Sequence, residues 1–105
     1  MNEVYASPEP PRAEVEALPG PTMLEFGSPT CGICRAAQPV IAQATEGLDG
    51  LRHIKVEDGP GRRLGRSFGI KLWPTLVFLK DGQEVVRLVR PTNAQVIKNA
   101  AHLII

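Results

Sequence analysis

The apolar positions of the chain fall into two kinds of run, continuous and helically spaced. The continuous runs Thr22–Phe26 and Thr75–Leu79 are typical of strands buried on both faces of a sheet. A third strand is predicted over 51–56. Asp81-Gly82 is a strong signal for a two-residue hairpin, so a further strand is expected to return through Val85–Val89.

Helically spaced apolar residues predict most of the remaining elements. The longest such pattern covers about 31–46, with Pro39 inside it as the source of a kink. Shorter helices are predicted over 60–68 and, after a Thr92–Gln95 capping box, through Ile104. The order of these elements implies an α/β fold in which a mixed sheet carries helices on both faces.

The first 21 residues have a different character. They hold five of the ten prolines, and Pro19-Gly20-Pro21 must interrupt any regular element. Between the breaks, 12–18 could form two helical turns, and Val4-Tyr5 could begin a short edge strand. The many prolines and few apolar residues make this start compatible with partial mobility.

Length and charge narrow the class of protein. The 105 residues fit one domain spanning 1–105, and a formal net charge of +1 gives no reason to expect nucleic acid or membrane partners. No basic stretch followed by an apolar run opens the chain, and no apolar run approaches the roughly 20 residues that span a bilayer. We therefore expect a soluble cytoplasmic monomer, although a chain trimmed of its leader would look the same.

Cys31 and Cys34 lie where a loop passes into the longest predicted helix. Free N–H groups and the dipole at a helix N-terminus favour the thiolate of Cys31, which is the attacking species in disulfide exchange. Cys34 follows one turn later on the same face, placed to resolve a mixed disulfide. Two other interpretations of the cysteines remain open. They could form half of a zinc site, although the histidines available as further ligands, His53 and His102, lack a finger-like spacing to them. They could also be two incidental thiols of the core.

Two segments resemble the thioredoxin family. Phe26 to Pro39 has its active-site pattern: a strand ending in an acid and Phe, a short loop, Cys-Gly-x-Cys, and a proline five residues on. Phe68–Leu76 is similar to a second family segment, and Lys80-Asp81-Gly82 to its closing hairpin. The resemblance covers about 22–105 and implies a thioredoxin-like fold, a three-layer α/β/α sandwich around a mixed sheet of four to five strands.

The resemblance also implies an activity. Cys31 would be the nucleophile and Cys34 the resolving cysteine of a thiol–disulfide oxidoreductase that needs no cofactor beyond their redox-active disulfide, and no metal. Its partners would be protein disulfides and thioredoxin reductase or an equivalent thiol reductant. The peptide bond before Pro74 would be cis, which would expose the Trp73 backbone to an extended substrate. The alternative interpretation is that Pro74 is an ordinary proline at the first position of a strand. The substrate-binding residues expected in this way are Gly32, Ile33, Trp73, Pro74 and Arg90.

Glu25 interrupts the apolar run Thr22–Phe26 at a position where the family carries a buried Asp. That Asp is thought to move the proton of the second cysteine, and a buried Glu25 carboxyl could act as a proton acceptor in the same way. Lys55 matches a family lysine and could pair with Glu25. Alternatively, Glu25 lies exposed on the sheet and Lys55 is a solvated charge.

The chain departs from the family around the cysteines. Typical thioredoxins read Trp-Cys-Gly-Pro-Cys, whereas Thr30 and Ile33 replace Trp and Pro here, and Gly27 replaces an aromatic residue. These changes leave the reduction potential open. Arg90-Pro91 stands in place of Gly-Ala, so Arg90 could narrow the groove or attract an acidic substrate, while Trp73 could contact substrate or cover the cysteines. The competing function is a thioredoxin-like binding module, or a redox protein dedicated to one partner without general reductase activity.

Overall fold

The computed structural model describes residues 4–105. Within them, one mixed sheet has the strand order β2-β1-β3-β4. The strands are β1 (Pro21–Gly27), β2 (Arg52–Glu57), β3 (Thr75–Lys80) and β4 (Gln83–Val89). Strand β1 is parallel to β2, and β3 is antiparallel to both of its neighbours. The predicted strands are confirmed, with ends shifted by one or two residues.

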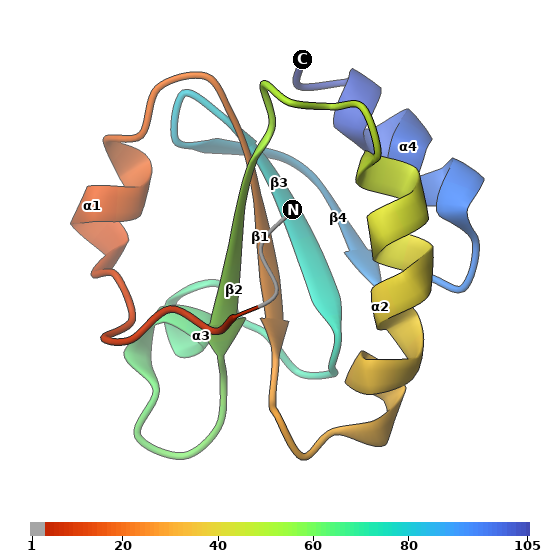
Figure 1. The fold of residues 1–105 in the computed structure, drawn as a ribbon. Coiled ribbons are helices and arrows are strands. Elements are labelled where there is room, and N and C mark those ends of the chain that lie inside the picture. Colours follow the sequence, from red (N-terminus) through yellow and green to blue (C-terminus); the bar gives the residue numbers. More distant parts are fainter. Residues whose placement is uncertain (1–3) are drawn as a thin grey trace.

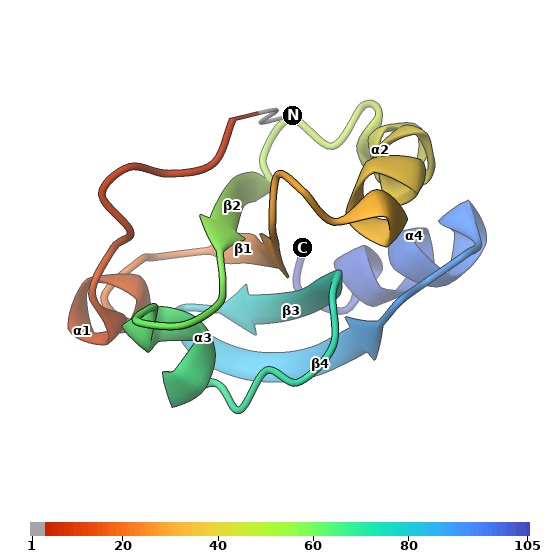
Figure 2. The same cartoon turned by 90° about the horizontal axis from the view of Figure 1, so that it is seen from below.

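Four helices cover the sheet: α1 (Arg12–Glu16), α2 (Gly32–Thr45), α3 (Arg63–Ser67) and α4 (Ala94–His102). Helices α2 and α4 pack together on one face, whereas α1 and α3 lie on the other (Figure 1). The view from below shows the sheet between these two layers (Figure 2). The predicted three-layer α/β/α sandwich is therefore confirmed.

Alternation along the central strands creates two cores, because successive strand residues point to opposite faces. The core beneath α2 and α4 includes Met23, Ile41, Leu76, Phe78 and Ile97. The core beneath α1 and α3 includes Val15, Leu24, Phe26, Leu64, Phe68 and Val77. Glu25 lies two residues after Met23, so it faces the α2 side of the sheet. This placement brings its carboxylate to the helix that begins at the cysteines.

The beginning of α4 corrects the predicted capping box. Asn93, rather than Thr92, is the N-cap residue, and its Oδ1 accepts the backbone N–H groups of Gln95 at 2.7 Å and Val96 at 3.3 Å. Asparagine ranks with the most favourable N-cap residues. One side-chain oxygen thereby satisfies two of the free donors of the first turn.

The described part of the proline-rich segment lies against β2 and α3. Tyr5 forms a single parallel bridge with Lys55, so the expected edge strand is reduced to one residue. Glu9 Oε1 accepts the first backbone N–H of α3 at 2.9 Å. The guanidinium of Arg12 lies 3.7 Å above the Phe68 ring. Contacts from residues far apart in the sequence thus tie this segment to the domain.

Gly82, in the β3–β4 hairpin, packs against the end of α1. Its φ is 80°, and an added Cβ would collide with the backbone carbonyl of Glu16. We expect Gly82→Ala to lower the free energy of unfolding by about 3 kcal/mol, because the cost of a left-handed alanine adds to this clash. Urea unfolding at 25 °C measures the loss.

Gly47→Ala is the matched control, because Gly47 has a φ of 79° and an added Cβ would meet no atom within 4 Å. That variant should lose only about 1 kcal/mol, the conformational cost alone. Equal losses in the two variants would contradict a specific contact between the hairpin and α1.

Candidate active site

Cys31 is the N-cap residue of α2, and its Sγ accepts the backbone N–H of Cys34 at 3.1 Å. The sulfur therefore uses one of the donors that a helix N-terminus leaves free. The preceding loop is closed by a hydrogen bond from the Cys31 N–H to the Ser28 carbonyl at 3.1 Å. Cys31 is partly exposed, whereas Cys34 is only 1% exposed. Of the two thiols, Cys31 is therefore the more accessible to another molecule.

The thiol of Cys34 lies in a closely packed interior. Burial, reinforced by the hydrogen bond with Cys31, raises the pKa of Cys34 to about 12. A Cβ on Gly27 would lie 2.8 Å from the Cys34 Sγ and 3.2 Å from the Tyr5 hydroxyl oxygen. Burial and the nearby Cys34 also raise the pKa of Tyr5. Both groups are therefore protonated at neutral pH, and Gly27 gives them the space they occupy.

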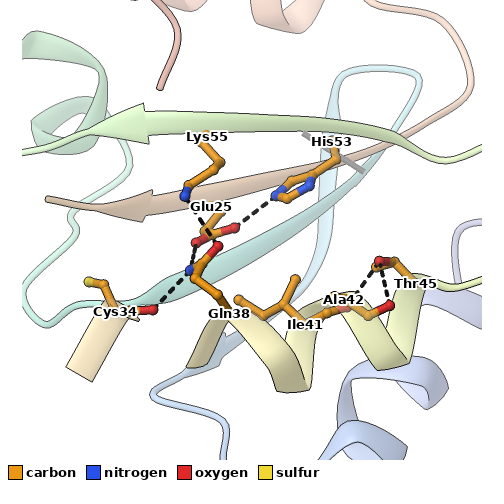
Figure 3. A network of polar contacts seen from close by, with 8 residues as sticks. All are labelled: Glu25, Cys34, Gln38, Ile41, Ala42, Thr45, His53 and Lys55. Atoms are coloured by element: carbon orange, nitrogen blue, oxygen red, sulfur yellow. Dashed lines mark hydrogen bonds and ion pairs between the residues drawn. The ribbon is translucent and has the colours of Figure 1, made fainter. Parts of the chain in front are cut away.

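A buried polar network lies between α2 and the sheet (Figure 3). Glu25 is fully buried, accepts a hydrogen bond from Gln38 Nε2 at 2.7 Å, and lies 2.8 Å from His53 Nε2. The same Gln38 nitrogen donates to the backbone carbonyl of Cys34 at 2.8 Å. Lys55 Nζ donates to the Gln38 oxygen at 3.1 Å. Gln38 thus joins the carboxylate to the helix turn that carries Cys34.

The burial of Glu25 is confirmed, while its role as a proton acceptor stays a prediction. The expected direct pairing of Lys55 with Glu25 is wrong among the described residues, because Lys55 bonds to Gln38 and His53 stands beside the carboxylate. The His53 side chain is 4% exposed, and the sequence alone indicates it only as a candidate zinc ligand. Two spacings in the sequence could have placed these side chains near Glu25. His53 lies on the same strand face as Lys55, and Gln38 follows Cys34 by one helical turn.

The Trp73–Pro74 segment closes the other side of the site. The peptide bond is cis, and the pairing of Phe26 with Thr75 puts Pro74 at the sheet end where the cysteine loop begins. The indole Nε1 of Trp73 donates to Asp58 Oδ2 at 2.9 Å, which holds the ring toward the loop after β2. The Trp73 carbonyl accepts a hydrogen bond from the side-chain Nε of Arg90.

Arg90 and Ile33 line one hollow of about 320 Å³. Its walls are residues of α2 from Ile33 to Val40 and the Arg90–Thr92 segment. Ile33 is 47% exposed, and Gly32 beside it is also exposed. The structure thus brings two of the expected substrate-binding residues, Ile33 and Arg90, to the same depression next to the cysteines.

Within residues 4–105, no three His, Cys, Asp or Glu side chains are grouped so that they could hold a metal ion. None of the described helices has the length and apolar character needed to cross a bilayer.

Comparison with known proteins gives consistent matches. The sequence model of the Thioredoxin family matches residues 7–102. Over 70 residues, the chain is 33% identical to Thioredoxin Asp f 28 of Aspergillus fumigatus and 34% identical to Thioredoxin 1 of Synechococcus elongatus. These alignments cover 67% and 66% of this chain, and 65% of the length of each of these curated relatives. The solved structure of reduced thioredoxin 2 from Pseudomonas aeruginosa PAO1 is 54% identical, with a TM-score of 0.84, covering 95% of this chain and 93% of that chain.

Proposed function

The chain belongs to the thioredoxin family, and we propose on this premise that it is a thiol–disulfide oxidoreductase that reduces protein disulfides through Cys31 and Cys34. One observation carries the proposal: the partly exposed Cys31 sulfur accepts an N–H bond at the N-terminus of α2, with buried Cys34 one turn behind. A helix N-terminus stabilises a thiolate in this position.

The reaction proceeds by two exchanges. The Cys31 thiolate attacks one sulfur of the substrate disulfide, that bond breaks, and the departing substrate sulfur takes the electron pair and then a proton. Cys34 then loses its proton and attacks Cys31 Sγ, which forms the Cys31–Cys34 disulfide and releases the second substrate thiolate. Glu25, whose negative charge acts on Cys34, is the proposed acceptor of that proton.

An external dithiol completes the cycle by reducing the Cys31–Cys34 disulfide. We assign this role to thioredoxin reductase or an equivalent thiol reductant, with no bound cofactor in this chain. The proposed setting is the cytoplasm, where cellular reductants keep thiols reduced. The protein is proposed to act there as a monomer on the disulfides of other proteins.

The test is the reduction of insulin disulfides by dithiothreitol with and without this protein at substoichiometric concentration. The proposal requires a rate well above that of dithiothreitol alone and multiple turnovers per protein molecule. Protein alkylated beforehand with iodoacetamide serves as the control and should show no acceleration. A folded, reduced protein that gives no acceleration would rule out general reductase activity and leave a dedicated partner or a binding role.

A further inference from the structure

Arg90 adopts an unusual backbone conformation at the edge of the site. It follows β4 with a φ of 51°, in a region that residues other than glycine rarely enter. Its backbone N–H donates to the Pro74 carbonyl at 2.8 Å, a bond that glycine could also make. Its side-chain Nε donates to the Trp73 carbonyl at 2.8 Å, a bond that requires a long side chain with a donor. The unfavourable backbone conformation of Arg90 therefore accompanies a side-chain contact that glycine, which would adopt this conformation without strain, could not make.

The bond to Trp73 fixes the guanidinium of Arg90 at the hollow that it lines together with Ile33. An arginine has five N–H donors, and the contact with Trp73 uses only the one on Nε, which leaves the donors of the two terminal nitrogens for a ligand. Among residues 4–105, no acidic side chain forms an ion pair with Arg90. A guanidinium held in this way has lost part of its rotamer freedom before a ligand arrives, so it is preorganised to bind a carboxylate.

The surroundings favour an acidic ligand. Arg35, which follows Cys34 in the chain, is also cationic and exposed, and its Nη1 donates to the Pro29 carbonyl at 3.2 Å. Asp58 accepts the indole N–H of Trp73 and lines a different hollow from Arg90. Arg90 is exposed and also forms part of the hollow of about 320 Å³ along α2, whose other lining residues are mostly apolar and offer no competing carboxylate.

Building on the proposed function, we propose that Arg90 is a specificity-determining residue that selects protein disulfides flanked by an acidic side chain. The carboxylate of the substrate binds the terminal nitrogens of Arg90, while Nε remains on the Trp73 carbonyl. The disulfide is thereby positioned over Cys31. Neutral or basic neighbours of the disulfide lack this contact and bind less well.

The experiment compares three disulfide-bonded peptides that differ only in the residue next to the attacked cysteine, which is Glu, Gln or Lys. Single-turnover rate constants for their reduction by the reduced protein are measured at low ionic strength. The wild type should reduce the Glu peptide about tenfold faster than the Gln peptide, with the Lys peptide slowest, as expected for one charge-assisted contact. Arg90→Gln should bring the Glu-to-Gln ratio close to one.

Two further variants separate the contact from the general field of the protein. Lys80→Gln removes the same charge at the far end of β3 and should keep the wild-type ratio. Arg90→Lys keeps the charge but cannot reproduce the planar, anchored fork, so its ratio should fall well below that of the wild type. A full ratio in Arg90→Lys, or an equal loss in Lys80→Gln, would overturn the proposal.

The outcomes also distinguish this proposal from the function on which it rests. Equal wild-type rates on the three peptides would overturn the role of Arg90 and leave the reductase function standing. Failure of the wild type to reduce any of the peptides would overturn both.

Discussion

Cys31→Ser is expected to abolish catalysed disulfide reduction while leaving the domain folded. Serine has no thiolate, so the first exchange cannot occur, and the rate of insulin reduction should fall by about 10³-fold or more to that of dithiothreitol alone. Serine is also a favourable N-cap residue, and its Oγ can accept the Cys34 N–H that Cys31 Sγ accepts now. The free energy of unfolding should therefore change by less than about 1 kcal/mol.

The insulin assay and urea unfolding together decide this prediction. Loss of activity with unchanged stability identifies Cys31 as the nucleophile. A Cys31→Ser protein that keeps a tenth of the wild-type activity would show that another group begins the reaction. Cys34→Ser is the matched variant, because it makes the same sulfur-to-oxygen change one helical turn away.

Cys34→Ser is expected to stop turnover at a later point, with substrate covalently attached to Cys31. The first exchange still proceeds, but no second thiol is available to release the mixed disulfide. Because intramolecular attack has a high effective concentration, its loss should slow release by about 10²-fold or more. Mass spectrometry under non-reducing conditions should show one substrate chain per protein, and dithiothreitol should remove it.

The pH dependence of thiol alkylation in the wild type tests the assignment of Cys34 as the buried, resolving cysteine. Burial raises the pKa of Cys34 to about 12, so this thiol stays protonated from pH 6 to 9 and should be alkylated slowly. Its small thiolate fraction rises about tenfold with each pH unit in this range. Rapid double alkylation at pH 7 would contradict the buried, resolving role of Cys34.

The fold and the candidate cysteine pair are predictable from the sequence because their signals are local. Two apolar runs, a glycine-containing hairpin and the Cys31–Cys34 spacing each specify structure within a few residues. The sequence places the α4 cap one residue too early because Thr92 and Asn93 are both capping residues, and only the hydrogen bonds that the Asn93 Oδ1 accepts decide between them.

The polar network could not be assembled from sequence order alone. His53 reaches Glu25 only through the register in which β1 and β2 pair, with Met23 opposite His53 and Glu25 opposite Lys55. Gln38 then enters from α2 and takes the bond with Lys55 that Glu25 was expected to make. The charge pair expected from the family resemblance is thus replaced by two hydrogen bonds through Gln38, one to Glu25 and one to Lys55.

The contact around Gly27 has an evolutionary consequence. An added Cβ there would lie 2.8 Å from the Cys34 sulfur and 3.2 Å from the Tyr5 hydroxyl oxygen. Because the sulfur is the closer neighbour, replacing Tyr5 alone would not make room for a side chain at position 27. A descendant that acquires a larger residue there must change position 5 and also shift the beginning of α2, so the evolution of this position is coupled to two other segments of the chain.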